Sequence, residues 1–413
     1  MYKLLQINST QNYGSTGRIA ENIGILANDN GFDTYMVHGP RCVNPSALKS
    51  ICTESSFEEN IHGVVSRLFD AHGLGSVCAT RKLIQKFKEI NPDIIHLHNI
   101  HGYYINYPIL FEYLKKAKKP IVWTLHDIWP FTGHCSYFEL DRYNWRSDCL
   151  NWRSDCRNCQ LKHSYPKSYT DFSHRNYNLK KKVFNGLDNM ILVPVSEWLD
   201  GLLKQSFLKD YKTKVIHNGI DISVFNLKDD NSEIKQKYGI TAEKIIIGVA
   251  SPFTPKKGFA DFIKLRQMLS EEYQIVLVGL TTEQISGLPF GITGIARTQN
   301  IQELASLYSV ADVFVNLTYA DNFPTTNLEA LACGTPVVTY RTGGSPEAVD
   351  DYTGIVIGKG DLSAAKDAVV SICEKGKAFY SEKCRSRAEK HFNKNNSFQK
   401  YIDLYRELLS DIS

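Results

Sequence analysis

Residues Asp312–Val338 read DVFVNLTYADNFPTTNLEALACGTPVV, two short apolar runs on either side of a polar loop and a helix-forming segment. The apolar runs are Asp312–Val315 and Val337–Thr339, and the helix-forming segment is Leu328–Ala332. Strands that are buried on both faces read as continuous apolar runs, and two parallel strands need a crossover such as a helix. These residues therefore predict a strand–helix–strand unit in a parallel sheet that is covered by helices.

The same alternation extends from this unit to both ends of the chain. The other predicted strands are Lys3–Ile7, Thr34–His38, Asp93–His98, Ile121–Leu125, Met190–Val195, Lys214–Ile216, Ile245–Val249, Gln274–Val278, Ile292–Ile295 and Gly354–Ile357. The other predicted helices are Gly17–Asn28, Arg81–Glu89, Ile105–Lys116, Glu197–Phe207, Phe259–Leu269 and Gln302–Tyr308. Repeated strand–helix units predict the α/β class, with doubly wound Rossmann-like parallel sheets.

The alternation pauses once, in the polar stretch Asn218–Tyr238. A chain of 413 residues has room for two such domains of about 200 residues each. We therefore expect an N-terminal domain at residues 1–222 and a C-terminal domain at residues 223–395. Residues 396–413 have an amphipathic pattern, which predicts a helix that crosses back to the first domain.

The composition excludes several classes of protein. Hydrophobic residues make up 43% and charged residues 22% of the chain, which disfavours a disordered, collagen-like or coiled-coil protein. No apolar run approaches the ~18 residues of a membrane span. The first residues, MYKLLQINST, lack the apolar core and the cleavage site of a signal peptide. We therefore expect a cytoplasmic protein.

The charge is distributed unevenly. Residues 1–220 carry 27 basic and 20 acidic side chains, a net charge of +7, whereas residues 221–413 carry 21 and 24, a net charge of −3. A solvated surface accounts for this, and so does a face toward an anionic partner such as a phosphorylated acceptor or a layer of lipid headgroups. Peripheral association with the cytoplasmic face of the inner membrane is therefore one expectation. No basic stripe with interleaved aromatic residues occurs, so we expect no nucleic-acid partner.

The loop after the strand at 312–315 contains features that suit a phosphorylated ligand. Ligands of open α/β sheets bind outside the carboxyl ends of the strands, and the cleft between two such domains is the default site. Pro324 suits the first turn of a helix. The backbone N–H groups of Thr325, Thr326 and Asn327 would then point outward, where they and the helix dipole attract phosphate.

Two carboxylates, Asp321 and Glu329, stand on either side of this helix start, with seven residues between them. Either one can accept hydrogen bonds from sugar or ribose hydroxyls. Taken singly, Asp321 is more simply a loop carboxylate and Glu329 a partner of the helix dipole. The residues around them are more specific, and these read EALACGTPVV at Glu329–Val338, GGSPE at Gly343–Glu347 and ELASLYSVADVFV at Glu303–Val315.

In these motifs the segment from Gln302 to Val349 resembles the donor-binding segment of retaining glycosyltransferases of family 4, which have the GT-B fold. The resemblance implies two Rossmann-like domains that face each other across a cleft. It also implies a nucleotide-diphosphate sugar as donor, bound by Glu329 and by the helix start at Thr325, Thr326 and Asn327. Asp321 and Glu329 are then the acidic residues that act on the sugar and the ribose.

Four further residues match the family outside this segment. Lys257 precedes Gly258 in ASPFTPKKGF and matches the lysine that meets the diphosphate, where a cation would stabilise the leaving group. His126 follows the strand Ile121–Leu125 and matches the histidine that positions the sugar, to which a neutral imidazole can donate a hydrogen bond. Gly14 and Gly17 flank a loop that lines the cleft in the family, although a glycine turn before a helix is common. The resemblance thus assigns His126, Asp321 and Glu329 to catalysis and Gly14, Gly17 and Lys257 to the donor.

Four of the ten cysteines, Cys135, Cys149, Cys156 and Cys159, lie in a polar insert at about residues 127–170. Four thiols in one long loop are typical of a structural zinc site. Unliganded thiols and a redox disulfide are the alternatives. A catalytic zinc is not expected, because four thiolates would close the coordination shell.

These observations lead to one expected function and two alternatives. We expect a hexosyl transfer from a nucleotide-diphosphate sugar to a hydroxyl of a glycan or lipid-linked acceptor, in the assembly of a surface polysaccharide such as O-antigen, capsule or exopolysaccharide. The family requires no catalytic metal. A nucleotide-sugar epimerase of similar two-domain shape is the enzymatic alternative, and a nucleotide-sugar-binding protein without turnover is the other.

Overall fold

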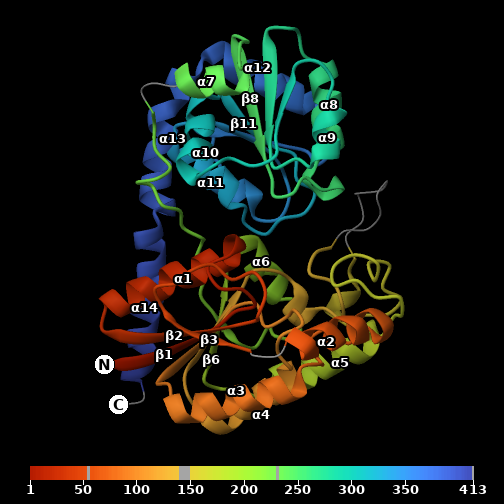
Figure 1. The fold of residues 1–413 in the computed structure, drawn as a ribbon, viewed down its shortest axis with the longest axis vertical. Coiled ribbons are helices and arrows are strands. Elements are labelled where there is room, and N and C mark those ends of the chain that lie inside the picture. The colour runs from red at the N-terminus through yellow and green to blue at the C-terminus, as the bar shows by residue number, and fades with distance from the viewer. Residues whose placement is uncertain (54–55, 139–148, 229–231, 412–413) are drawn as a thin grey trace. The chain divides into compact units, whose positions relative to one another are not determined.

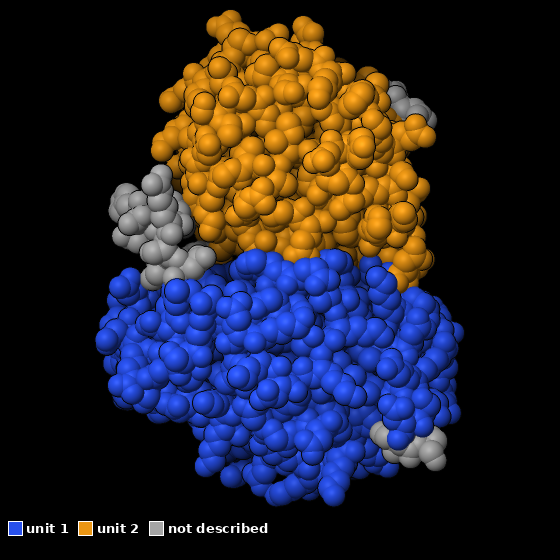
Figure 2. Space-filling model, turned by 180° about the vertical axis from the view of Figure 1, so that it is seen from behind, with its two compact units in different colours: residues 1–140, 146–217, 397–413 blue, residues 141–145, 218–396 orange. Residues whose placement is uncertain are grey.

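Two separate parallel sheets, each with helices on both faces, form the framework of the chain (Figure 1). The computed structural model describes residues 1–53, 56–138, 149–228 and 232–411. Unit 1 contains the described residues before Asn218 together with the segment that begins at Ser397, and unit 2 contains Asn218–Asn396 (Figure 2). The predicted α/β class with two doubly wound sheets is confirmed.

Unit 1 contains a sheet of seven parallel strands in the order β3-β2-β1-β4-β5-β6-β7. Its strands are β1 (Tyr2–Ile7), β2 (Phe32–His38), β3 (Lys49–Cys52), β4 (Ile94–Leu97), β5 (Ile121–Leu125), β6 (Met190–Pro194) and β7 (Lys212–Thr213). Its helices are α1 (Gly14–Asp29), α2 (Ser56–Phe69), α3 (Val77–Ile90), α4 (Tyr107–Ala117), α5 (Ser173–Phe184), α6 (Glu197–Leu203) and α14 (Lys394–Ser410).

The C-terminal helix α14 belongs to the core of unit 1. Tyr401, Ile402 and Tyr405 of this helix are buried against the sheet in one apolar cluster that also contains Leu4 of β1 and Ile23 of α1. The Tyr405 hydroxyl lies 2.6 Å from His96 Nδ1, and Thr124 Oγ1 lies 2.8 Å from His96 Nε2. Residues from the two ends of the chain therefore build one hydrophobic core.

The opposite face of this sheet is covered by aromatic packing. Trp123 of β5 points to the other side from Val122, and its ring lies 5.5 Å from Phe111 of α4 and 5.0 Å from Phe184 of α5. All three side chains are almost completely buried. Rings of this size remove a large apolar area from water, so α4 and α5 are held firmly against β5.

Unit 2 contains a sheet of six parallel strands in the order β10-β9-β8-β11-β12-β13. Its strands are β8 (Lys244–Val249), β9 (Tyr273–Val278), β10 (Ile292–Ile295), β11 (Val313–Asn316), β12 (Val337–Tyr340) and β13 (Gly354–Ile357). Its helices are α7 (Ser232–Tyr238), α8 (Phe259–Gln267), α9 (Thr282–Ser286), α10 (Ile301–Val310), α11 (Thr325–Ala332), α12 (Leu362–Lys375) and α13 (Lys377–Phe392).

Several elements differ from the sequence-based prediction, and the helices α2, α5, α9, α12 and α13 were not predicted. The last strand of unit 1 is Lys212–Thr213, which pairs with Ile191 and Leu192, and not Lys214–Ile216. The edge strand β3 (Lys49–Cys52) was not predicted, because its half-exposed residues KSIC form no apolar run. Helix α7 lies inside the polar stretch Asn218–Tyr238, in which the alternation of strands and helices was expected to pause. None of the helices in the described ranges is both long enough and apolar enough to cross a membrane.

Candidate functional site

The strand order of each sheet reverses at one point, which is where open α/β sheets bind ligands. In unit 2 this point lies between β8 and β11. The loops after these two strands are in direct contact, since Tyr319 N donates to Lys256 O at 2.7 Å. Gly258 has a φ of +74°, and a Cβ atom there would lie 2.2 Å from the carbonyl oxygen of Leu317. Glycine at position 258 is therefore required for this close approach of the two loops.

The contact between the two loops joins two of the predicted site residues. Lys257 Nζ lies 2.6 Å from Asp321 Oδ2, and the two side chains are 26% and 21% exposed. The pair is thus accessible from solvent but mostly enclosed. A cation and a carboxylate at this spacing can bind an anionic group and a hydroxyl of the same ligand.

The glycine pair Gly343-Gly344 supports the Asp321 loop from the other side. Gly343 has a φ of +53°, and a Cβ atom there would lie 1.8 Å from the carbonyl oxygen of Asp321. Gly344 N donates to Asn322 O at 2.8 Å. The pair Gly343-Gly344 therefore allows the loop after β12 to pack against the loop that carries Asp321.

The N-terminus of α11 lies at the end of the same loop. Thr325 and Thr326, both half-buried, form its first turn, while Pro324 stands one position earlier than predicted, at the N-cap. No side chain caps this terminus, and its first turn carries no acidic residue. The positive end of the helix dipole at Thr325 is therefore not neutralised by the helix's own side chains, which suits a phosphate.

Asn327, the third residue of this predicted helix start, is completely buried. Its Oδ1 accepts from Asn316 Nδ2 at 2.7 Å, its Nδ2 donates to Ser345 Oγ at 3.0 Å, and its backbone N–H donates to Pro324 O at 3.3 Å. These contacts hold the start of α11 to β11 and to the turn at Ser345–Ala348. In this structure Asn327 therefore fixes the position of the helix.

Glu329, one turn further along α11, is half-buried and receives a hydrogen bond from Tyr308 of α10. The distance from the Tyr308 hydroxyl to Glu329 Oε2 is 3.0 Å. Burial, with the Glu329 charge as a further cause, raises the pKa of Tyr308 well above its usual value, so the phenol remains a donor. The sequence analysis assigned no role to Tyr308, although it lies in the family-like motif ELASLYSVADVFV.

In unit 1 the strand order reverses between β1 and β4. Helix α1 begins at Gly14, three residues earlier than predicted, so Gly17 lies inside its first turn. A Cβ atom at Gly17 would lie 2.7 Å from Thr10 Oγ1 in the loop after β1. Gly17 therefore allows the helix to pack closely on this loop, and Gly14 has a φ of +65° at the helix start.

A chain of hydrogen bonds fixes the tautomer of His126, which follows β5. Gln6 Nε2 donates to Ala20 O at 3.0 Å, so its Oε1 faces His98 Nε2, at 2.9 Å. His98 Nε2 is then the donor and its Nδ1 accepts from His126 Nε2, at 3.2 Å. In the neutral ring of His126 this makes Nδ1 the acceptor nitrogen. Burial lowers the pKa of His126 to about 4, which keeps the ring neutral near pH 7.

A second polar cluster of unit 1 was not predicted as a unit. Asp127 Oδ2 lies 2.7 Å from His101 Nε2, and both side chains are buried. Nearby, Lys180 Nζ donates to Trp129 O at 2.7 Å and lies 3.4 Å from the centre of the Trp129 ring. Burial lowers the pKa of Lys180 to about 7. These contacts hold η1 (Trp129–Phe131), which begins three residues after His126, in a fixed position.

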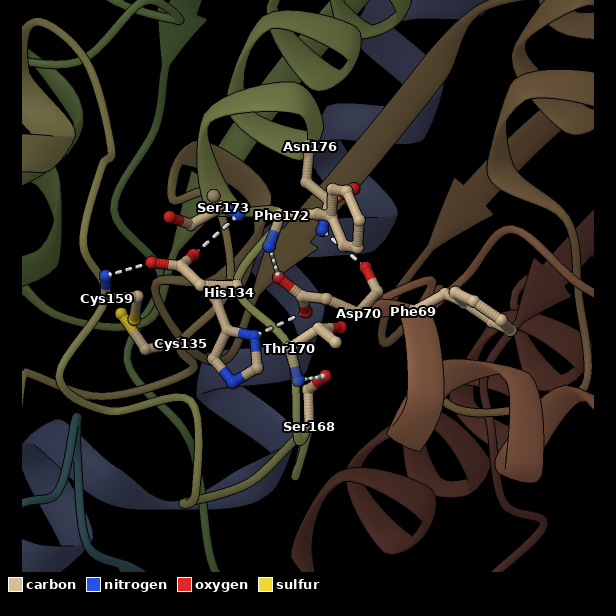
Figure 3. Close-up of polar contacts among 12 residues, drawn as sticks. Phe69, Asp70, His134, Cys135, Cys159, Ser168, Thr170, Phe172, Ser173 and Asn176 are labelled. Atoms are coloured by element: carbon tan, nitrogen blue, oxygen red, sulfur yellow. Dashed lines mark hydrogen bonds and ion pairs between the residues drawn. The ribbon is translucent and has the colours of Figure 1, made fainter.

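The cysteine insert lies outside the described residues at positions 139–148, but all four of its cysteines are described. Cys135, Cys149, Cys156 and Cys159 line one cavity, which has a volume of about 340 Å³. The thiol of Cys135 is hydrogen-bonded to Cys159, and Figure 3 shows the two sulfur atoms side by side, near the buried pair of His134 and Asp70. The hydrogen bond lowers the pKa of Cys159 to about 7, and burial raises that of Cys156 to about 12.

These thiols do not form a ready-made metal site. Among the residues that the structure describes, no group of three or more His, Cys, Asp or Glu side chains has an arrangement that would hold a metal ion. The hydrogen bond between Cys135 and Cys159 is compatible with both alternatives, unliganded thiols and a redox disulfide. The structural zinc remains a prediction, which metal analysis of the purified protein would decide.

Comparison with known proteins identifies the class to which this fold and site belong. The structure resembles sucrose-phosphate synthase from Thermosynechococcus elongatus, with a TM-score of 0.71 and 16% identity over 100% of both chains. It also resembles Anabaena Alr3699/HepE in complex with UDP-glucose, with a TM-score of 0.67 and 16% identity over 98% of this chain and 100% of the other. The fold is the GT-B fold of glycosyltransferases.

The family follows from the sequence comparisons. Residues 51–224 match the model of "Glycosyltransferase Family 4" and residues 230–391 that of "Glycosyl transferases group 1". The chain is 22% identical to the colanic acid biosynthesis glycosyl transferase WcaC of Escherichia coli (strain K12) over 330 residues, 77% of each protein. It is also 27% identical, over 48% of this chain and 50% of the relative, to D-inositol 3-phosphate glycosyltransferase of Saccharomonospora viridis. The protein belongs to family 4 of the glycosyltransferases.

Proposed function

We propose that this glycosyltransferase moves a hexosyl unit, with retention of the anomeric configuration, from a nucleotide-diphosphate sugar to a hydroxyl of a glycan or lipid-linked oligosaccharide. The reaction serves the cytoplasmic assembly of a surface polysaccharide such as O-antigen, capsule or exopolysaccharide. One observation carries the proposal. The ion pair of Lys257 and Asp321 lies at the strand-order switch of unit 2, in the loops that lead to the uncapped N-terminus of α11.

Different residues of unit 2 bind different parts of the donor in this proposal. The N–H groups at Thr325 and Thr326 and the ammonium group of Lys257 bind the diphosphate, because both present positive charge to it. Glu329, oriented by Tyr308, accepts hydrogen bonds from the ribose hydroxyls, and Asp321 accepts from the transferred sugar. As the glycosidic bond breaks, negative charge grows on the leaving diphosphate, and the same positive groups stabilise it.

His126 of unit 1 has a separate role in the proposal. Its hydrogen bond to His98 leaves Nδ1 as the acceptor nitrogen. The donation to the sugar that was expected from the sequence does not fit this tautomer, because the N–H group of His126 is engaged by His98. The neutral imidazole accepts a hydrogen bond from a sugar hydroxyl instead, which would orient the sugar without changing its charge. Substitution of His126 should therefore reduce turnover without abolishing the binding of nucleoside diphosphate.

Two kinds of relative support the substrate classes. The Anabaena protein was crystallised with UDP-glucose, which supports a nucleotide-sugar donor. WcaC is named for colanic acid biosynthesis, and WaaG, which this chain resembles at a TM-score of 0.64 and 14% identity over 97% of this chain and 99% of the other, is a glycosyltransferase involved in lipopolysaccharide biosynthesis. These names support an acceptor from surface-polysaccharide assembly.

Catalysis in this proposal needs no divalent cation, because Lys257 and the start of α11 supply the positive charge. Turnover should therefore continue in the presence of excess EDTA. Loss of activity in EDTA that added Mg²⁺ or Mn²⁺ restores would contradict this part of the proposal.

A panel of nucleotide sugars, each incubated with and without a mixture of glycan and lipid-linked acceptors, tests the function. Nucleoside diphosphate that is released only with an acceptor supports transfer. A donor whose sugar is altered without an acceptor would instead indicate an epimerase, and binding without any product a sensor. The NMR coupling constant of the new anomeric proton then decides between retention and inversion.

Within that assay, Glu329→Ala should lower the rate of transfer by about tenfold or more, because a charge-assisted hydrogen bond contributes about 1.5–3 kcal/mol. Glu374→Ala, at an exposed carboxylate on α12, is the matched control and should leave the rate unchanged. Equal rates for the two variants would contradict the role of Glu329.

A further inference from the structure

Helix α2 (Ser56–Phe69) is amphipathic, but its polar face is the one that is buried. Glu59, His62 and Ser66 are 8%, 1% and 2% exposed. The apolar side chains on the opposite face are in solvent. Phe57 is 73%, Ile61 46%, Val64 54% and Leu68 46% exposed. The usual arrangement of an amphipathic surface helix is the reverse, with the apolar stripe toward the core.

The four exposed side chains form one continuous stripe, called the α2 stripe below. They follow each other at intervals of four, three and four residues, so they lie on a single face of the helix. Eleven residues at 1.5 Å per residue give the stripe a length of about 16 Å. A contiguous apolar surface of this kind on a folded protein marks a site of interaction.

The helix cannot hide the stripe by rotating, because its polar face is fixed by specific hydrogen bonds. His62 Nε2 accepts from the N–H groups of Gly73 and Gly75, both at 3.0 Å, and His62 Nδ1 lies 3.1 Å from Ser76 Oγ. A Cβ atom at Gly75 would lie 2.4 Å from the His62 ring, so the loop and the imidazole are in close contact. The orientation of α2 is therefore a property of the folded unit.

Further apolar groups continue the surface at the C-terminal end of α2. Tyr169 N donates to Arg67 O at 2.7 Å, and Thr170 Oγ1 donates to Leu68 O at 2.7 Å. These bonds bring two more exposed rings, Tyr169 and Phe172, beside the helix. Figure 3 shows Phe69, which is itself 52% exposed, extending away from the polar contacts around Asp70.

Cations accompany these apolar groups. Arg67, Lys167 and Arg175 are all exposed. Lys167 Nζ lies 5.7 Å from the centre of the Tyr169 ring, and the Arg175 guanidinium lies 4.6 Å from that of Phe172. Two carboxylates also lie nearby, and they accept hydrogen bonds from backbone N–H groups, Glu58 from Ala79 N at 3.2 Å and Asp171 from Cys159 N at 2.7 Å. Both carboxylates are half-buried, whereas the three cations are exposed. The surface is therefore apolar in the middle, and its exposed charges at the edge are mainly positive.

We propose that the α2 stripe, with Phe69, Tyr169 and Phe172 beside it, docks unit 1 onto an anionic lipid surface. Helix α2 lies in the plane of that surface, with its stripe at the boundary between headgroups and acyl chains and with Arg67, Lys167 and Arg175 against the headgroups. An apolar helix face with flanking aromatic and basic residues is the pattern of an interfacial helix. The excess of basic side chains in residues 1–220 agrees with this partner.

Lipid explains the arrangement better than a second copy of the chain or another protein. Three cations that stand at the rim of an apolar surface are complementary to a layer of anionic headgroups, whereas they would repel each other across a symmetric contact between two copies. The proposal agrees with a lipid-linked acceptor but does not depend on it, because it concerns binding and not transfer.

Flotation of the purified full chain with lipid vesicles tests the proposal without any substrate. The chain should float with vesicles that contain phosphatidylglycerol, and binding should weaken with pure phosphatidylcholine or in high salt. Ile61→Ser with Leu68→Ser should reduce the bound fraction by about tenfold or more. These positions are half-exposed, so the variant should keep the melting temperature of the wild type, which is measured in parallel.

Phe290→Ser with Phe379→Ser is the matched control, because it removes two side chains of unit 2 that are 88% and 51% exposed. This variant should bind vesicles as well as the wild type does. A wild-type chain that stays away from anionic vesicles, or equal loss of binding in both variants, would overturn the proposal. So would a wild-type dimer that Ile61→Ser with Leu68→Ser converts to a monomer while vesicle binding stays unchanged.

Discussion

The hydroxyl of Tyr308 donates a hydrogen bond to the carboxylate of Glu329 across 3.0 Å, from α10 to α11. Tyr308 is completely buried, whereas Glu329 is half-buried. The backbone of Tyr308 is fixed as well, since Thr335 Oγ1 donates to its carbonyl oxygen at 2.6 Å. A buried donor thus orients the carboxylate that we assign to the ribose, and this arrangement can be tested separately from the carboxylate itself.

Tyr308→Phe should raise the KM for the nucleotide sugar by about tenfold, because a hydrogen bond to a charged group contributes about 1.5–3 kcal/mol. The turnover number should change less, since the carboxylate remains. Tyr238→Phe is a closely matched control in the same unit, because the Tyr238 hydroxyl donates to Glu303 at 2.9 Å, a contact outside the proposed site. Steady-state kinetics that vary the donor would show the difference, and the same KM in both variants would refute the orienting role of Tyr308.

Lys257→Ala and Asp321→Asn should have opposite effects on the binding of free nucleoside diphosphate. The first variant removes the cation and should weaken binding by about tenfold. The second removes a carboxylate that lies 2.6 Å from the cation and should strengthen binding while it slows transfer. Isothermal titration calorimetry with a panel of nucleoside diphosphates measures both effects, and Lys264→Ala, at an exposed position on α8, is the control. Weaker binding in Asp321→Asn would contradict the assignment.

Acid should destabilise the protein through its buried histidines. Burial lowers the pKa values of His126 and His62 to about 4, from an ordinary value of about 6.5. Between these values the unfolded chain binds more protons than the folded one, so the stabilisation is complete above about pH 6.5 and is lost as the pH falls through about 4. The free energy of unfolding in urea should therefore decrease over this range.

His126→Gln should make that decrease less steep, because it removes one of the groups that bind a proton only on unfolding. It should not abolish the decrease, since burial also lowers the pKa values of His96 and His98. His163→Gln, at an exposed position, is the control and should keep the slope of the wild type. Parallel curves for all three proteins would show that His126 does not contribute.

Most of the framework could be predicted from sequence, because buried parallel strands such as Ile121–Leu125 are continuous apolar runs. Candidate site residues could be located in the sequence for a related reason. Lys257 and Asp321 lie in loops that follow such strands, and glycines next to these loops permit the contacts that bring them together. Tyr308 could not be assigned, because its partner lies on another helix and the contact depends on how α10 and α11 pack.

Helix α2 shows a second kind of feature that could not be predicted from the sequence. Its apolar residues follow a helical period, but the sequence analysis predicted no helix there. Periodicity alone would also have placed Phe57, Ile61 and Val64 in the core. The hydrogen bonds of His62 to the loop at Gly73 and Gly75 decide which face is buried, and these join parts of the chain whose contact is not visible in any local pattern.

The reactivity of the cysteine insert can distinguish its three predicted states, which are zinc-bound thiols, unliganded thiols and a disulfide. If the thiols are free, Cys159 should react with iodoacetamide at about pH 7.5 faster than Cys156, because a thiolate is the reactive form. The reason is that the hydrogen bond from Cys135 lowers the pKa of Cys159 to about 7, whereas burial raises that of Cys156 to about 12. Mass spectrometry of the labelled peptides gives the order, with the exposed Cys78 as reference.

The other two states give different results in the same experiment. Bound zinc would protect all four insert cysteines until a chelator is added, and a disulfide between Cys135 and Cys159 would protect only that pair until a reductant is added. From the contact between these two thiols we expect free labelling in the reduced protein and selective protection of the pair after mild oxidation. Protection of all four cysteines that only a chelator removes would instead establish the structural zinc site.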